Sequence, residues 1–183
     1  MTIRHSLQSV FLFSAIQIAV SLISTLNAQG QITQQSKVAM SGIGAIKVGM
    51  TVDEASKAAN TQIVTESGGA ESCSYGRLKG GKLKGLSFMV SNGNITRVDV
   101  NSREISTLKG AKVGDSEDRI KSLYVGQITI NNLQYSQHGH TLTVTPRSRA
   151  DQKYLLVFET DGKRVTKFKS GLKSSVEASE GCS

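Results

Sequence analysis

The sequence predicts an α+β fold made of two tandem units, each a short helix followed by an antiparallel sheet. The first observation is a repeat: residues 46–59 and 111–124 share Lys-Val-Gly, then Thr or Ser after one residue, then apolar residues at helical spacing. The second is that each copy is followed by an apolar strand, a two-residue turn and another strand, with the turns at Asn92-Gly93 and Asp161-Gly162. A tandem repeat of this kind constrains the architecture before any single motif is considered.

The N-terminus has the layout of a secretory signal peptide, which we assign to residues 1–28. A basic start is followed by an apolar run at residues 10–23 and by small residues at 26–28, as in a cleavage site. The apolar run is shorter than the roughly 20 residues that a membrane span needs, so we favour cleavage over a transmembrane anchor. We therefore expect an exported protein, periplasmic or extracellular, with no transmembrane segment after cleavage. Residues 29–42 are polar and without periodicity, and are expected to be a flexible leader.

The first unit is placed at residues 43–104. Thr51 followed by Glu54 is the signature of a capping box, and apolar residues recur at helical spacing up to Ala59. Asn92-Gly93 is the dipeptide that a tight hairpin prefers, because both of its residues tolerate positive φ. The expected strands of this unit are residues 61–66, 72–77, 86–90 and 95–100.

The second unit is placed at residues 105–170. Asp115, Glu117 and Asp118 crowd the start of its helix, where the helix dipole favours negative charge. Pro146 is the only proline of the chain and is expected to end a strand. Residues 171–183 are expected to be a C-terminal tail. The expected strands are residues 127–131, 140–145, 154–159 and 164–169.

Cys73 and Cys182 are the only cysteines, and a disulfide between them is the simplest interpretation in an exported chain. It would close a loop of more than 100 residues and hold the C-terminal tail against the first unit. In the chain-entropy treatment such a loop contributes roughly 4–5 kcal/mol. The alternative is a pair of free thiols for redox work, which we favour less because the spacing is not C-x-x-C.

The stretch V-G-M-T-x-x-E-A at residues 48–55, a hairpin, and F-E-T-D-G-K-R-V-T at residues 158–166 resemble the outer-membrane-assembly lipoprotein (SmpA/OmlA) and β-lactamase-inhibitor-protein group. The resemblance covers most of residues 43–170 and implies a β-lactamase-inhibitor-protein-like fold. It also implies action by contact, either in assembling envelope proteins or in blocking an enzyme. The inhibitory loops do not align here, and the lipid-anchor cysteine of the assembly lipoproteins is missing. The chain is also similar to small secreted cyanobacterial proteins of unknown activity.

His138 and His140 are weak candidates for a metal site. Residues two positions apart on a strand face the same side of the sheet, and two imidazoles placed in this way could bind a transition metal. A structural site normally needs four ligands, however, and no nearby Cys, Asp or Glu completes one, so we favour an exposed turn. No serine lies in G-x-S-x-G, and capping explains the carboxylates at the helix starts. We expect no catalytic residue, no cofactor and no enzyme activity.

The loop bearing Arg77, Lys79, Lys82 and Lys84 is the tentative binding site in a chain of net charge +8. Such charge attracts anionic partners, although these residues could simply be solvated and keep the protein soluble. Nucleic acid is not expected, because no aromatic residues alternate with the basic ones as stacking platforms.

We therefore expect an exported binding module that contacts another envelope or secreted protein through its open sheet face and basic loop, in an inhibitory or assembly-related role. The alternative is a salt-sensitive binder of anionic polymers or of a membrane surface, and an enzyme of unknown type is the least favoured interpretation.

Overall fold

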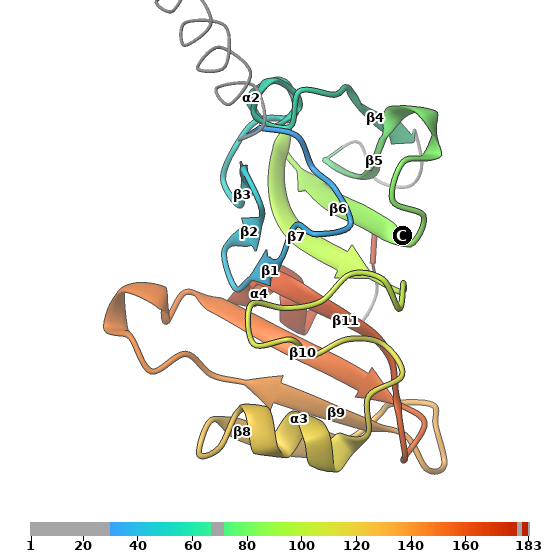
Figure 1. The fold of residues 1–183 in the computed structure, drawn as a ribbon. Coiled ribbons are helices and arrows are strands. Elements are labelled where there is room, and N and C mark those ends of the chain that lie inside the picture. Colours follow the sequence, from blue (N-terminus) through green and yellow to red (C-terminus); the bar gives the residue numbers. More distant parts are fainter. Residues whose placement is uncertain (1–29, 67–71, 179–180, 183) are drawn as a thin grey trace, which may run out of the picture.

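The structure, a computed structural model, describes residues 30–66, 72–178 and 181–182, so the signal peptide assigned to residues 1–28 lies outside it. Its centre is one antiparallel sheet of eight strands in the order β4-β5-β6-β7-β11-β10-β9-β8, shown in Figure 1. The α+β class is thus confirmed. The strands are β4 (Ile63–Glu66), β5 (Cys73–Leu78), β6 (Leu86–Ser91), β7 (Asn94–Val100), β8 (Ile128–Asn132), β9 (His140–Val144), β10 (Tyr154–Thr160) and β11 (Val165–Leu172).

The helices are short. Helix α2 (Val52–Ala58) precedes the strand group β4–β7, α3 (Glu117–Leu123) precedes the group β8–β11, and α4 (Lys173–Glu177) follows β11. Two 3-10 turns lie at Lys79–Gly81 and Arg149–Asp151. Within the described residues, no helix has the length and apolar character to cross a membrane.

The first helix begins at the predicted capping residue, and the second begins at Ser116, the residue that aligns with it in the repeat. The Thr51 hydroxyl accepts the Glu54 N–H at 3.2 Å, and the Glu54 carboxylate accepts the Thr51 N–H at 2.9 Å, which completes the capping box. In α3 the Ser116 hydroxyl accepts the Arg119 N–H at 3.2 Å. Each helix then buries its predicted apolar face in the core, with Ala55 and Ala59 in one and Ile120 and Tyr124 in the other.

The chain enters both helices through the same hydrogen-bond pattern. The N–H of Gly49 donates to the carbonyl of Ile95 at 2.8 Å, and the N–H of Gly114 donates to the carbonyl of Val165 at the same distance. In return, Ile95 donates to Met50 at 2.8 Å and Val165 donates to Asp115 at 2.9 Å. Both glycines have positive φ, 99° and 92°, which lets the chain turn from this contact into the helix.

The two predicted hairpin turns form, but by different means. Asn92 and Gly93 have φ of 49° and 78°, as a two-residue turn between twisted strands requires. In the other turn only Gly162 has positive φ, and the Asp161 carboxylate instead accepts the N–H groups of Lys163 and Arg164, each at 2.8 Å.

Strands β7 and β11 join the two strand groups into one sheet, with Val100 opposite Phe168 and Arg97 opposite Gly171. A side chain at Gly171 would overlap the Thr96 carbonyl, so glycine permits the close approach of the strands here. The buried side chains on one face of this sheet form a continuous core. Its largest members include Phe88, Phe158 and Phe168.

Residues 30–42, expected to be a flexible leader, instead pack against the rest of the chain. Here β1 (Val38–Ala39) and β2 (Gly42–Ile43) form a small sheet with β3 (Ile46–Lys47). The Val38 N–H donates to the Ser106 carbonyl at 3.0 Å, and Ile32 is only 5% exposed. The isolated apolar residues of this polar stretch carry no periodic signal, but burying them removes enough apolar surface from water to order the segment.

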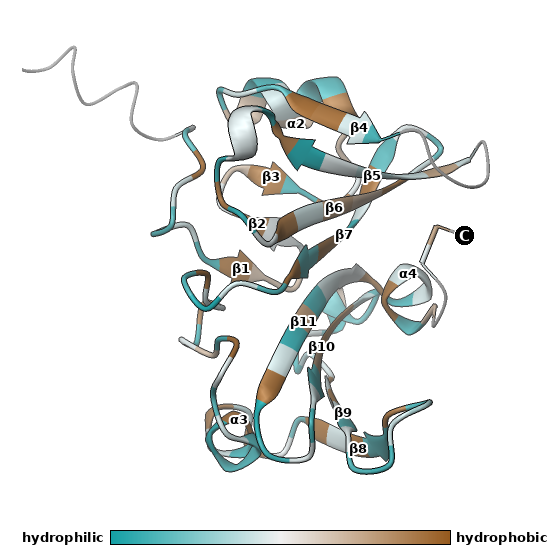
Figure 2. Cartoon of the chain, turned by 90° about the vertical axis from the view of Figure 1, so that its right-hand side faces the viewer, coloured by the Kyte–Doolittle hydropathy of each residue, from teal (hydrophilic) through white to brown (hydrophobic). Residues whose placement is uncertain are grey.

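The C-terminal segment is also more ordered than the expected tail. Strand β11 continues to Leu172, and α4 lies against β10 and β11, as Figure 2 shows. Val176 of α4 is buried with Leu155 and Val157, which lie on the sheet face opposite the main core. Helix α4 therefore covers part of a face that α2 and α3 leave uncovered.

Candidate binding cleft

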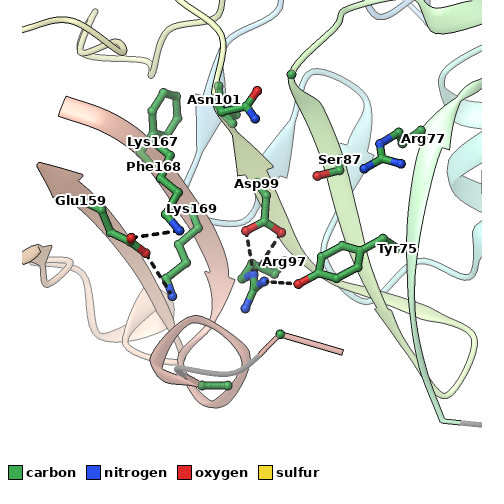
Figure 3. Close-up of a pocket in the computed structure, with 14 residues that line it drawn as sticks. Tyr75, Arg77, Ser87, Arg97, Asp99, Asn101, Glu159, Lys167, Phe168 and Lys169 are labelled. Carbon is green, nitrogen blue, oxygen red and sulfur yellow. Dashed lines mark hydrogen bonds and ion pairs between the residues drawn. The ribbon is translucent and has the colours of Figure 1, made fainter. Parts of the chain in front are cut away.

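The sheet face opposite the main core carries a charged cleft beside α4. Along β7, Val98 and Val100 are buried in the main core, so the alternating side chains of Arg97 and Asp99 lie on the other face. A cavity of about 300 Å³ opens there, and Figure 3 shows its lining. It is lined by Tyr75, Arg77, Ser87, Arg97, Asp99, Asn101, Glu159, Lys167 and Lys169, together with Gly85, Val100, Phe168, Ala178 and Gly181.

Arg97 is the fixed centre of the cleft and is only 4% exposed. Its Nε lies 2.9 Å from an Asp99 carboxylate oxygen, Nη1 donates to the Ser175 carbonyl at 2.6 Å, and Nη2 donates to the Tyr75 hydroxyl at 3.0 Å. One guanidinium thus connects β7, β5 and α4. Because a buried charge is tolerated only when it is paired and hydrogen-bonded, these contacts hold the side chain in one position.

Burial also changes the acidity of Asp99. Removal from water raises the pKa of this carboxyl, and the nearby positive charge of Arg97 opposes the shift without cancelling it. Asp99 therefore takes up a proton more readily than an exposed carboxyl does, and in its ionised form it is paired with Arg97. Its role in the cleft is to neutralise the buried guanidinium.

Lys169 and Lys167 reach the cleft from β11 and meet Glu159 of β10. Lys167 Nζ lies 3.0 Å from the Glu159 carboxylate, whereas Lys169 Nζ lies 3.8 Å from it. The Lys169 side chain is 17% exposed, and burial, reinforced by the charge of Arg97, lowers the pKa of its ammonium group. Within the described residues no acceptor is hydrogen-bonded to this ammonium group, so it is the least satisfied charge of the cleft.

The cleft is net positive but carries both signs. Four basic side chains, Arg77, Arg97, Lys167 and Lys169, face two acidic ones, Asp99 and Glu159. Ionisable groups with shifted pKa values that converge on a cavity mark a candidate functional site. The arrangement suits recognition of an anionic group by fixed donors.

The structure divides the predicted basic loop. Arg77 of β5 lines the cleft and forms an ion pair with Glu66. Lys79, Lys82 and Lys84 are exposed in the segment that joins β5 to β6, and none of them lines the cleft. The four basic residues therefore do not all line the cavity, because alternation along β5 places Arg77 on the same face as Tyr75 while the three lysines lie in the connection that follows.

Tyr75, Asp99 and Glu159 are cleft residues that the sequence did not single out. The available signal was charge at alternate positions of otherwise apolar strands, namely Arg97 and Asp99 in β7 and Lys167 and Lys169 in β11. Such spacing places both charges of a strand on one face. It does not show that the two strands are neighbours.

The predicted histidine pair also separates. His138 is exposed in the connection before β9, as the exposed-turn interpretation expects. His140 is instead the first residue of β9, and its Nδ1 lies 2.8 Å from Oε1 of the buried Glu117. Among the residues that the structure describes, no group of three His, Cys, Asp or Glu side chains could hold a metal ion.

The predicted disulfide between Cys73 and Cys182 is confirmed. It fastens the C-terminal segment to β5, next to the cleft, and Gly181 beside it lines the cavity. The bond therefore helps to fix one wall of the candidate site.

Comparison with known proteins supports the fold and leaves the activity open. No protein-family model and no curated protein matches the chain. Among solved structures, the chain is similar to the uncharacterized protein yfeY from Escherichia coli, with a TM-score of 0.50 and 15% sequence identity. The match covers 74% of this chain and 99% of that one. At this identity the likeness is one of fold, and the resemblance to the SmpA/OmlA group stays a prediction.

Proposed function

We propose that this chain is an exported, non-enzymatic binding module that contacts another envelope or secreted protein through the sheet face around the cleft. The observation that carries the proposal is the fixed charge network of Arg97, Asp99 and Tyr75 beside the less satisfied Lys169. Charges held in this way before binding recognise a partner at little entropic cost. They also reject partners whose charges do not match.

A contact role fits the chemistry of the cleft better than a catalytic role. Both carboxylates are engaged, Asp99 with Arg97 and Glu159 with Lys167 at 3.0 Å. A general base needs a carboxylate or imidazole free to take a proton from the reacting group. The cleft residues are arranged as paired ions, which favour recognition.

Export is part of the proposal and is supported by the disulfide. Structural disulfides form and persist in oxidising compartments and are rare in the cytosol. The Cys73–Cys182 bond joins residues 109 positions apart, so it constrains most of the folded chain. A cleavable signal at residues 1–28 would deliver the protein to such a compartment.

We further propose that the chain consists of two tandem copies of one unit, as the resemblance to the SmpA/OmlA and β-lactamase-inhibitor-protein group implies. The support is the matched entry into α2 and α3, in which Gly49 pairs with Ile95 and Gly114 with Val165, and the four-strand meander that follows each helix. On this view the cleft forms where the last strands of the two copies, β7 and β11, meet.

The test is affinity capture from an envelope and secreted extract with residues 29–183 and two matched variants. The rim variant carries Arg77→Ser and Lys167→Ser, and the loop variant carries Lys79→Ser, Lys82→Ser and Lys84→Ser. We expect one protein to remain bound to the unaltered chain and to the loop variant through a high-salt wash, and to be lost from the rim variant. Loss from the loop variant alone would move the site to the loop and reject the cleft.

The exposed lysines of the loop support a second candidate function, a salt-sensitive binder of anionic polymers or of a membrane surface. Exposed charges are screened as ionic strength rises, so this binding should disappear at high salt. Broad retention of anionic material that elutes with salt, and that the loop variant fails to retain, would favour this function over the protein-binding module.

A further inference from the structure

We infer that the cleft is a carboxylate-binding site in which the Lys169 ammonium group and the Tyr75 hydroxyl receive an Asp or Glu side chain of the partner protein. The inference rests on the proposed function and names the chemistry of its contact. Lys169 comes from β11 and Tyr75 from β5, on either side of Arg97 in β7, as Figure 3 shows.

The first support is that, among the described residues, the Lys169 ammonium group has no anion within hydrogen-bond distance. Asp99 is its direct neighbour across the β7–β11 pairing, but Arg97 engages the Asp99 carboxylate at 2.9 Å. The Glu159 carboxylate lies 3.0 Å from Lys167 Nζ but 3.8 Å from Lys169 Nζ, so its closer partner is Lys167. An ammonium group withdrawn from water without close hydrogen bonds is costly, and an incoming carboxylate would remove that cost.

The second support is the donor capacity of Tyr75. Its hydroxyl oxygen accepts a hydrogen bond from Arg97 Nη2 at 3.0 Å, so the hydroxyl hydrogen is left to donate. Among the described residues, no acceptor is hydrogen-bonded to that hydrogen. Because Arg97 is itself fixed by Asp99 and the Ser175 carbonyl, the direction of the Tyr75 hydroxyl is set before a ligand arrives.

The mixed charge of the cleft favours a carboxylate over a phosphate group. A carboxylate carries one charge and matches the Lys169 ammonium group, which lacks a close hydrogen bond among the described residues. A phosphate near neutral pH carries more charge, and its extra charge would face the carboxylates of Asp99 and Glu159, which line the same cavity. Like charges held so close together repel each other, and this repulsion lowers the affinity for the ligand.

The experiment uses the mature chain and two small probes, N-acetylglutamate amide and its neutral isostere N-acetylglutamine amide. Each is titrated at constant ionic strength while backbone amide and lysine side-chain NMR signals are followed. We expect the glutamate probe to produce saturable shifts at Asp99 and Lys169 and to raise the pKa of Lys169, and we expect the glutamine probe to produce neither. Inorganic phosphate is the third probe and should bind more weakly than the glutamate probe.

Lys169→Met tests the ammonium group, because methionine keeps the length of the side chain and removes its charge. Loss of a charge-assisted hydrogen bond should raise the dissociation constant of the glutamate probe about tenfold or more. Lys79→Met is the control, since Lys79 is exposed outside the cleft, and it should leave the constant unchanged. Equal binding by Lys169→Met, equal effects of the two variants, or tighter binding of phosphate would each overturn the inference.

The capture experiment separates this inference from the proposed function. If the rim variant loses the captured protein but Lys169→Met retains it at unchanged affinity, the binding module stands and the carboxylate site is rejected. If Lys169→Met weakens binding of both the glutamate probe and the captured protein, the binding module and the carboxylate site are both supported.

Discussion

Nδ1 of His140 lies 2.8 Å from Oε1 of Glu117, so the first residue of β9 is connected to the first turn of α3. The same carboxylate oxygen accepts the Thr160 hydroxyl of β10 at 2.5 Å. Burial raises the pKa of Glu117, but the hydrogen bonds from Thr160 and His140 outweigh burial, and the pKa of this carboxyl is lowered.

This pairing predicts a loss of stability in acid. A carboxyl whose pKa is lower in the folded state stabilises the fold above its unfolded pKa, near 4.5, and that contribution is lost as the pH falls through the folded pKa. Glu117→Gln should therefore reduce the pH dependence of unfolding below pH 4.5. It should also lower the free energy of unfolding at pH 7 by about 1–3 kcal/mol, as for a hydrogen-bonded charge.

The measurement is urea unfolding of the parent and of Glu117→Gln between pH 3 and pH 7. Asp118→Asn is the matched control, because Asp118 lies on the same helical turn with a side chain that is 93% exposed. The ion pair of Asp118 with Lys121 lies at the surface, and a surface pair contributes less than about 1 kcal/mol to the free energy of unfolding. The same acid dependence in Glu117→Gln as in the parent would contradict the assignment.

Helices α2 and α3 and the individual strands of the large sheet could be predicted from the sequence because their signals are local. Thr51 with Glu54, the Asn92-Gly93 turn and the alternating apolar residues of β6 and β7 each specify structure within a few positions. The small sheet β1–β3 could not, because each of its strands has only two residues. Its position depends on the remote contact between Val38 and Ser106.

The cleft could not be predicted for a related reason. Arg97 and Lys169 come together only because β7 pairs with β11, and no local pattern specifies which strands become neighbours. Glu117 was explained by its place at the start of the helix, through capping and the helix dipole, and that local explanation left no reason to look for His140. Local patterns thus predicted helices α2 and α3 and the strands of the large sheet, whereas the candidate site arose from the pairing between strands.

Removal of the disulfide should destabilise the fold strongly. The Cys73–Cys182 bond spans 109 positions, and the chain-entropy treatment gives about 4–5 kcal/mol for a loop of this length. The double variant Cys73→Ser with Cys182→Ser should lose this amount in urea unfolding. The parent should fall to the same stability when a reductant is added, and the double variant should not respond to it. A parent that is insensitive to the reductant would show that the bond contributes little.

Gly171→Ala should weaken the contact between β7 and β11. Its methyl group would overlap the Thr96 carbonyl and lie 2.7 Å from the Arg97 Cα, and backbone atoms there cannot move aside without separating the strands. Gly80→Ala is the control: Gly80 has φ of 78° but open space around it, so this variant carries only the backbone strain of about 1–2 kcal/mol. Gly171→Ala should cost more than the control in thermal unfolding, and equal losses would argue against the steric explanation.

Ser170→Ala should leave the protein as stable as the parent or more stable. The Ser170 hydroxyl is buried on the core side of β11, and among the described residues it has no hydrogen-bond partner. An unsatisfied buried hydroxyl costs about 1–3 kcal/mol, so its removal should raise the free energy of unfolding by about 1 kcal/mol. Ser106→Ala is the opposite case, because the buried Ser106 accepts a hydrogen bond from Lys37 Nζ at 2.8 Å and its removal should destabilise. The same sign of change in both variants, measured by urea unfolding, would mean that hydrogen bonding does not distinguish the two hydroxyls.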